Sequence, residues 1–182
     1  MEYFSKVKLK NGLDCTITNA KKENAEEMIG IFSLTHTQTD NLLSLPEECT
    51  MTVQEEEDFL QNLEQSEREV ELMAQVDGKI VGSAGIEKIG NHIKTNHRAE
   101  FGISIDKAFW GLGIGKELTK ACIECAKRAG YTQIELQVVS TNTSAISLYK
   151  SLGFIQYGVL PCGFCSKEAG EQALVFMYLP LK

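Results

Sequence analysis

The chain has 182 residues, of which 43% are hydrophobic, and this size is typical of one domain with a sizeable core. Its formal net charge of -7 at pH 7 disfavours binding to nucleic-acid phosphates or to an anionic membrane surface. The sequence contains neither a run typical of a signal peptide nor a stretch approaching the ~20 apolar residues of a membrane span. We therefore expect a single cytoplasmic domain over residues 1–182, without nucleic-acid or membrane partners.

The first third of the chain predicts one strand and two helices. The strand is expected at about residues 13–18, and the helices at about 22–34 and 53–65, with a polar loop at 35–50. Thr52 and Glu55 have the spacing of a capping box, in which a hydroxyl and a carboxylate each bind a free amide at a helix start. The second helix therefore begins beside Thr52.

From residue 69 the apolar pattern changes from the helical period to a period of two. Residues 69–76 and 79–88 flank Asp77-Gly78, a pair that tolerates the positive φ of a tight hairpin. A fourth strand is expected at 98–105, followed by a glycine-rich turn and a helix at 113–129 that Gly130 ends.

The remaining elements complete a mixed α/β pattern. A strand at 133–138 has one apolar face, a helix at 143–152 ends at Gly153, and two strands lie near 154–160 and 173–179. The strands on either side of the 113–129 helix imply a crossover and a parallel pair, whereas the hairpins imply antiparallel neighbours. The expected fold is a twisted mixed sheet of six to seven strands with helices on both faces.

Six cysteines include two Cys-x-x-Cys pairs, Cys122/Cys125 and Cys162/Cys165. Such pairs could bind zinc through four thiolates if the fold brought them together, as in a zinc-stabilised interaction protein. However, their separation exceeds that of a compact zinc ribbon, and the first pair falls on an apolar helical stripe with Leu118. We expect core cysteines and no metal site.

Gly111, Gly113 and Gly115 lie between the predicted strand at 98–105 and the helix that follows it. Free amides at a helix start and the positive end of the helix dipole attract phosphate oxygens, and glycine lets a ligand approach the backbone. The alternative is an ordinary glycine turn. The GxGxG spacing fits neither a Walker loop nor the GxGxxG of a dinucleotide-binding fold.

This turn resembles motif A of the GNAT superfamily of N-acetyltransferases, (Gln/Arg)-x-x-Gly-x-(Gly/Ala), with Trp110 in place of the usual Gln or Arg. Residues 142–154, NTSAISLYKSLGF, are similar to the NxxAxxLYxxxGF pattern downstream in the same family. The two motifs occur in order, separated by a helix and a strand. The resemblance covers about residues 69–179 and implies a GNAT-like fold and acetyl-CoA as co-substrate.

The resemblance also implies contacts to coenzyme A. The pyrophosphate would lie on the turn formed by Trp110, Gly111, Leu112, Gly113, Ile114 and Gly115. The backbone of Ile103, Ser104 and Ile105 would pair with the pantetheine arm as an added strand does, and Asn142 would hydrogen-bond that arm. Trp110 weakens any side-chain contact to phosphate but leaves the backbone amides unaffected. Asn142 could instead serve as a helix cap.

Acetyl transfer from a thioester to an amine requires a proton donor for the leaving thiolate. A phenol with a pKa of about 10 can protonate a thiolate whose conjugate acid has a pKa of about 8.5. The resemblance assigns this role to Tyr149. Spacing alone favours a core aromatic at Tyr149, because Ala145, Leu148 and Leu152 share its helical stripe, and only the motif match favours the proton donor.

The attacking amine must also lose a proton, since an alkyl amine with a pKa of about 10.4 is mostly protonated at neutral pH. In part of the family a glutamate on the strand before the turn acts as the base, which makes Glu100 the candidate; a water chain is the alternative.

The expected function is therefore acetyl transfer from acetyl-CoA to a primary amine, in a small molecule or at a protein N-terminus. A non-catalytic acetyl-CoA-binding regulatory module of the same fold is the alternative. In similar proteins the segment between the first two helices walls the acceptor site, and here it is acidic, which favours a cationic acceptor. Its acidic residues are Asp40, Glu47, Glu48, Glu55, Glu56, Glu57 and Asp58. Helix-dipole and solvation effects alone also explain them, and the sequence leaves a homodimer open.

Overall fold

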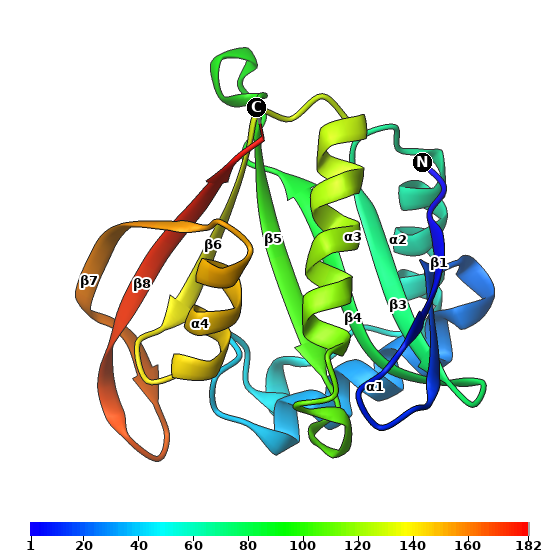
Figure 1. The fold of residues 1–182 in the computed structure, drawn as a ribbon, viewed down its shortest axis with the longest axis horizontal. Coiled ribbons are helices and arrows are strands. Elements are labelled where there is room, and N and C mark those ends of the chain that lie inside the picture. Colours follow the sequence, from blue (N-terminus) through cyan, green and yellow to red (C-terminus); the bar gives the residue numbers. More distant parts are fainter. Residues whose placement is uncertain (182) are drawn as a thin grey trace.

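A single twisted sheet joins all the strands of residues 1–181, the part of the chain that this computed structural model describes (Figure 1). The strands are β1 (Phe4–Lys8), β2 (Asp14–Asn19), β3 (Val70–Val76), β4 (Lys79–Lys88), β5 (Arg98–Ile105), β6 (Gln133–Val139), β7 (Ile155–Ser166) and β8 (Gly170–Pro180). Their order is β1-β2-β3-β4-β5-β6-β8-β7. Only β5 and β6 pair in parallel, on either side of the crossover through helix α3. The mixed α/β prediction is confirmed.

The described residues contain eight strands rather than the six to seven expected. The missed strand is β1, an exposed edge strand whose five residues, FSKVK, include two lysines and only two apolar side chains. The β7–β8 hairpin is also longer than expected, because β7 continues to Ser166 and β8 begins at Gly170. Both differences concern exposed parts of the sheet, where apolar alternation is weak.

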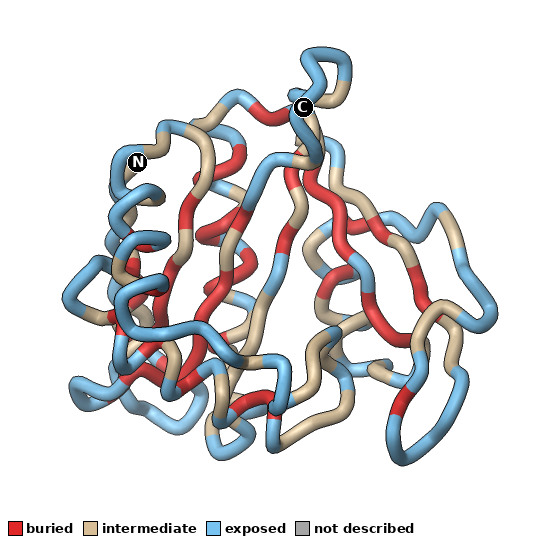
Figure 2. Tube along the Cα trace, turned by 180° about the vertical axis from the view of Figure 1, so that it is seen from behind, coloured by how far each residue is buried: buried red, intermediate tan, exposed pale blue. Residues whose placement is uncertain are grey.

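Four α-helices of the described chain cover the two faces of the sheet (Figure 1). They are α1 (Ala25–Gln38), α2 (Val53–Gln65), α3 (Ile114–Arg128) and α4 (Thr143–Ser151). Helices α3 and α4 pack on one face, in a large core cluster that includes Leu118, Phe101 and Tyr149. Helices α1 and α2 pack on the other face around a smaller cluster that includes Met28 and Leu60. Figure 2 shows the buried residues concentrated along the central strands, whereas β7 is largely exposed.

Local sequence signals explain several boundaries. The Glu55 amide donates to the Thr52 hydroxyl at 3.2 Å, and the Thr52 amide donates to the Glu55 carboxylate at 2.8 Å, so the predicted capping box starts α2. Helix α1, in contrast, extends to Gln38, four residues beyond the predicted end at 34. No helix within residues 1–181 is long and apolar enough to cross a membrane.

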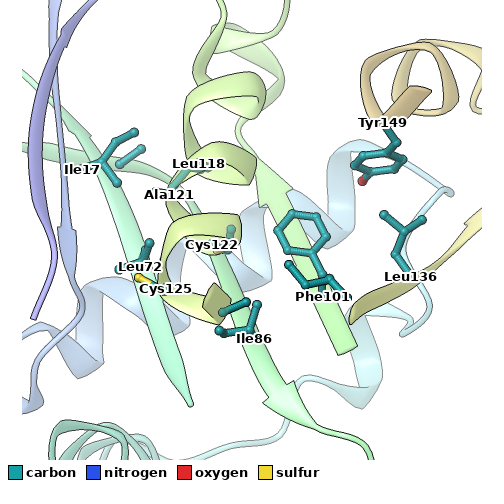
Figure 3. Close-up of a cluster of buried hydrophobic side chains, with 14 of the residues drawn as sticks. Ile17, Leu72, Ile86, Phe101, Leu118, Ala121, Cys122, Cys125, Leu136 and Tyr149 are labelled. Carbon is teal, nitrogen blue, oxygen red and sulfur yellow. The ribbon is translucent and has the colours of Figure 1, made fainter. Parts of the chain in front are cut away.

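The structure separates the two Cys-x-x-Cys pairs. Cys122 and Cys125 are 0% exposed on the sheet-facing side of α3, as predicted (Figure 3). Cys162 and Cys165 are exposed on β7, so the prediction that they are core residues was wrong. Their strand forms the sheet edge, pairs with β8 alone and is mostly exposed. The fold does not bring the four thiols together as a zinc site would require.

One carboxyl group lies within the sheet face covered by α2. Glu71 on β3 is paired with Gly85, where any Cβ atom would collide with the Glu71 carboxylate, so the glycine leaves room for it. Burial raises the pKa of Glu71 to about 7; a hydrogen bond from Ser83 opposes the rise, and the nearby Glu56 and Glu87 carboxylates add to it. The Glu71 carboxyl is therefore protonated more readily in the folded protein than in the unfolded chain.

This shift predicts a pH-dependent stability. A raised pKa means that the contribution of Glu71 is fully present below the unfolded value of 4.5 and is lost as pH rises toward about 7. The Glu71→Gln variant, which cannot ionise, should therefore be more stable than the parent at about pH 8, by roughly 1–3 kcal/mol, with little difference below about pH 4. Urea unfolding across this range, with the exposed Glu26→Gln as control, measures the effect. A difference independent of pH would contradict it.

Candidate active site

The sheet separates between its two central parallel strands. Residues Arg98–Glu100 of β5 pair with Gln133–Glu135 of β6, but β5 continues to Ile105 and β6 to Val139 without further pairing to each other. Figure 1 shows the two strands diverging beyond this point, with α4 beside β6. The edge of β5 that contains Ile103, Ser104 and Ile105 therefore has no strand partner on this side within residues 1–181. An extended ligand could hydrogen-bond to this edge as an added strand does.

The open edge leads directly into a turn with free amides. Gly111 and Gly113 have φ values of 77° and 103°, in the left-handed region, and Gly113 starts α3 without a side-chain cap. The Glu117 amide donates to the Gly113 carbonyl at 3.2 Å, so the amides that precede it have no intrahelical acceptor. A Cβ atom at Gly111 or Gly113 would meet nothing within 4 Å. The turn thus presents unobstructed donors at a helix N-terminus, which suits an anion.

The other residues of the turn hold it in place. A Cβ at Gly115 would lie 3.3 Å from Ile105 and 3.4 Å from Leu148, so this glycine permits α3, β5 and α4 to meet closely. Ile114 is 1% exposed in the core, and the Leu112 carbonyl accepts a hydrogen bond from the Lys10 amide at 3.2 Å. Leu112 and Ile114 can therefore offer backbone amides to a ligand while their other groups anchor the turn.

Trp110 ties the turn to the end of β5. Its indole nitrogen donates to the Ile105 carbonyl at 2.7 Å, and its side chain is 46% exposed. An indole has a single donor, so this bond leaves none for a phosphate. Trp110 therefore makes no side-chain contact to a phosphate and instead links the turn to the backbone of β5. The motif match did not predict this role.

Tyr149 projects from α4 toward the region where β5 and β6 separate, next to Phe101 and Leu136 (Figure 3). Its ring packs edge-on against Phe101, with 6.1 Å between centroids, and lies 5.6 Å from the ring of Phe154. The residue is only 6% exposed, and burial raises the pKa of its phenol to about 12. The phenol is therefore protonated at neutral pH. Within residues 1–181, the Tyr131 hydroxyl is fully buried and has no hydrogen-bond partner, and this is not the case for the Tyr149 hydroxyl.

Glu100 lies on the opposite face of the sheet. Neighbouring side chains of a strand alternate, and Phe101 faces Tyr149, so Glu100 faces away from it. Glu100 is opposite Glu87 on β4 and Glu135 on β6, and its carboxylate accepts a hydrogen bond from the Gln137 amide at 3.3 Å. Burial, followed by the charge of Glu100, raises the pKa of Glu87. Tyr149 and Glu100 thus lie on opposite faces of the sheet, near the point where the pairing of β5 and β6 ends.

An ion pair reinforces the short paired segment of the two strands. Arg98 donates to both carboxylate oxygens of Glu135, at 2.5 and 2.6 Å. The guanidinium holds the pKa of Glu135 below its usual value, so this carboxylate stays charged and paired. Arg98, Glu135 and Gln137 were not identified from the sequence. Their alternation on strands was visible, but the register of β5 against β6 was not.

Asn142 caps α4. Its side-chain oxygen accepts from the Ala145 amide at 3.1 Å, which confirms the capping interpretation. The same residue lies at the end of the β6–α4 connection, on the helix that positions Tyr149. Its side-chain NH₂ has no bond within the described residues, so a ligand could still accept from it.

The acidic residues near α1 and α2 mostly have partners within the protein. Glu55 belongs to the capping box and Glu57 lies 3.4 Å from Lys22, while Glu56 is buried. In the α1–α2 connection, Asp40 accepts a hydrogen bond from Ser166, and Glu47 pairs with Lys167. These contacts support the structural interpretation of the acidic segment and place the connection against the tip of the β7–β8 hairpin.

Comparison with known proteins agrees with this geometry. The family model for the acetyltransferase (GNAT) family matches residues 31–154, more than half of the sequence, and the chain therefore belongs to this family. An N-alpha-acetyltransferase of Sulfurisphaera tokodaii is 27% identical over 161 residues, covering 83% of this chain and 86% of that protein. Three curated relatives that are 31% to 34% identical match over only 38% to 52% of their own length.

Solved structures show the same fold. An acetyltransferase of the GNAT family from Streptococcus pneumoniae superposes with a TM-score of 0.87 at 26% identity, over 91% of this chain and 99% of that one. The structure of yncA, a putative acetyltransferase from Salmonella typhimurium with its cofactor acetyl-CoA, has a TM-score of 0.81 at 22% identity, over 92% and 94% of the two chains.

Proposed function

We propose that this protein is an N-acetyltransferase that moves an acetyl group from acetyl-CoA to a primary amine, with residues 1–182 forming one cytoplasmic domain. The observation that carries the proposal is the continuity of the unpaired β5 edge with the free amides of residues 111–115. An extended chain ending in a pyrophosphate matches both parts, because it can pair with the strand and place its phosphates at the helix start. Acetyl-CoA has this form, and the yncA structure contains it.

The placement of Tyr149 and Glu100 on opposite faces supports a division of the proton transfers. The amine nitrogen attacks the thioester carbonyl carbon, and Glu100 accepts the amine proton directly or through water. As the carbon–sulfur bond breaks, Tyr149 donates its phenolic proton to the departing sulfur. The high pKa of Tyr149 keeps that proton in place until the thiolate forms. Asn142 would orient the pantetheine arm.

The role of Glu100 is tested by Glu100→Gln, which removes the base and keeps the size. At neutral pH turnover should fall by about 10² or more, and the loss should shrink as pH rises toward the pKa of the amine, which then loses its proton unaided. Turnover against pH is the measurement, using an amine found by screening a panel for coenzyme A release. Glu171→Gln, at an exposed strand position on β8 away from this site, is the matched control and should have a much smaller effect. An equal loss at every pH would return Glu100 to a structural role.

The same screen tests the alternative, a non-catalytic acetyl-CoA-binding module, which would bind the co-substrate and release no coenzyme A with any amine. We propose a cationic acceptor, because Glu87 and Glu100 face the side from which the amine would approach. A homodimer stays a prediction. The edge strand β7 supports it, since Ile155, Val159 and Leu160 are each about half exposed beside unpaired backbone groups.

A further inference from the structure

Two exposed thiols lie on the strand that forms the far edge of the sheet. Cys162 and Cys165 are both exposed and free on β7. The remaining cysteines differ from them: burial raises the pKa of Cys15, Cys49 and Cys125, the last to about 11, and that of Cys122 well above its usual value. Because the thiolate is the nucleophile, a raised pKa makes these thiols poor reactants; Cys15, Cys122 and Cys125 are also buried, and Cys49 is partly buried. The exposed thiols of the described residues are therefore those of one Cys-x-x-Cys pair, Cys162 and Cys165.

A register shift interrupts the regular pairing of β7 at the first of the two thiols. Leu160 is paired with Leu174, and Phe164 is paired with Gln172. Between these two pairs β7 therefore advances by four residues while β8 advances by two, which is a bulge in β7. In a flat strand, residues three apart are separated by about 10 Å, whereas a disulfide requires about 4.4–6.8 Å between Cα atoms. A bulge bends the strand that contains it, so the bulge at residues 161–163 favours a shorter separation than in a flat strand.

The bulge is also packed in a specific way. A Cβ at Gly163 would lie 2.7 Å from the Cβ of Leu174 and 3.1 Å from that of Leu160, so only glycine fits there. Gly163 therefore lies against the hairpin, while Cys162 and Cys165 on either side of Gly163 and Phe164 remain exposed. Closing the thiols into a disulfide requires movement of the bulge and not of the core.

We propose that Cys162 and Cys165 are a redox modification site that forms a reversible disulfide with low-molecular-weight disulfides as oxidants. One cysteine thiolate attacks the small disulfide, forms a mixed disulfide and releases one small thiol. The second cysteine thiolate then attacks the protein sulfur of that mixed disulfide and releases the other small thiol. The two cysteines are oxidised, the small disulfide is reduced to two thiols, and the two cysteine protons are transferred to them or to buffer.

The modification has a structural consequence. Ser166 and Lys167 directly follow Cys165 and hold the α1–α2 connection through Asp40 and Glu47. Drawing the bulge toward Cys165 changes the geometry of the hairpin tip and so loosens these contacts. Oxidation of the dithiol therefore releases the α1–α2 connection from the hairpin.

The test uses the full chain incubated with oxidised glutathione and then alkylated and digested. We expect the peptide that contains both cysteines to lose two hydrogens and escape alkylation, and dithiothreitol to reverse both changes. Cys162→Ser and Cys165→Ser should each trap a stable mixed disulfide with glutathione at the remaining thiol, and Cys49→Ser should behave like the parent. Alkylation of both thiols after oxidation, or a stable mixed disulfide in the parent, would overturn the proposal.

A second measurement follows the structural consequence without relying on catalysis. Amide hydrogen exchange in residues 40–48 should become several-fold faster in the oxidised protein than in the reduced one. The Lys167→Ala variant removes one of the two contacts and should show faster exchange already when reduced. Unchanged exchange in the oxidised protein would overturn the coupling between the disulfide and the α1–α2 connection.

Discussion

Replacing Tyr149 by Phe should lower the turnover of acetyl transfer by about 10² or more while leaving acetyl-CoA affinity nearly unchanged. Phenylalanine keeps the ring that packs against Phe101 and Phe154, so the core is preserved and only the proton donor is lost. Steady-state kinetics with an accepted amine gives the turnover, and calorimetry gives the affinity. Because the pKa of Tyr149 is about 12, the parent should lose no activity through ionisation of this phenol near neutral pH.

A matched control separates the lost hydroxyl from any effect on packing. Tyr131 is also buried, at 3% exposed, and its enclosed hydroxyl has no partner within residues 1–181. Tyr131 follows the C-terminal end of α3, whereas the glycine turn precedes its N-terminal end. The guanidinium carbon of Arg68 lies 4.3 Å from the centroid of the Tyr131 ring. Tyr131→Phe should therefore leave turnover unchanged and stability unchanged or slightly higher. Equal turnover in both variants would make Tyr149 a core aromatic only.

Replacing Gly113 by Leu should abolish acetyl-CoA binding, for which we expect a micromolar Kd in the parent, about -8 kcal/mol. The new side chain would extend from a backbone that now faces open space, into the region where the amides of the turn would receive the pyrophosphate. Calorimetry on the folded variant measures the loss.

Strain must be separated from obstruction in this experiment, because a φ of 103° disfavours any side chain. Gly130 supplies the control: it has a φ of 77°, a Cβ there would also meet nothing within 4 Å, and it follows the other end of α3. Gly130→Leu should lose a similar amount of stability and keep acetyl-CoA affinity. If both variants bind as tightly as the parent, the turn does not hold the coenzyme.

Much of the fold could be predicted because its signals are local. The capping box of Thr52 and Glu55 and the Asp77-Gly78 turn marked α2 and the β3–β4 hairpin at their observed boundaries or within one residue. Strand β1 and the outer parts of β7 and β8 were missed, because these exposed parts of the sheet need not alternate between apolar and polar residues. The exposure of Cys162 and Cys165 follows from the same cause.

The candidate site was predictable to the extent that motifs specify it. The glycine turn and the residues 142–154 pattern pointed to the free amides and to Tyr149, which are set by short segments. The opposite placement of Glu100 and Tyr149 depends on strand register, and the bond between Gln137 and Glu100 joins residues on different strands. The hydrogen bond from the Trp110 indole to the Ile105 carbonyl depends on the side-chain conformation of Trp110, which the folded backbone determines.

The early end of pairing between β5 and β6 makes the sheet two half-sheets joined by a short seam at Arg98–Glu100. On one side, α3 packs across β3, β4 and β5; on the other, β6, β8 and β7 form a separate antiparallel group. A ligand that pairs with the free edge would act as a removable strand that helps to hold the halves together. Part of the rigidity of the molecule is then supplied from outside the polypeptide, and a ligand present at 100 times its Kd would add about 2.7 kcal/mol to the free energy of unfolding.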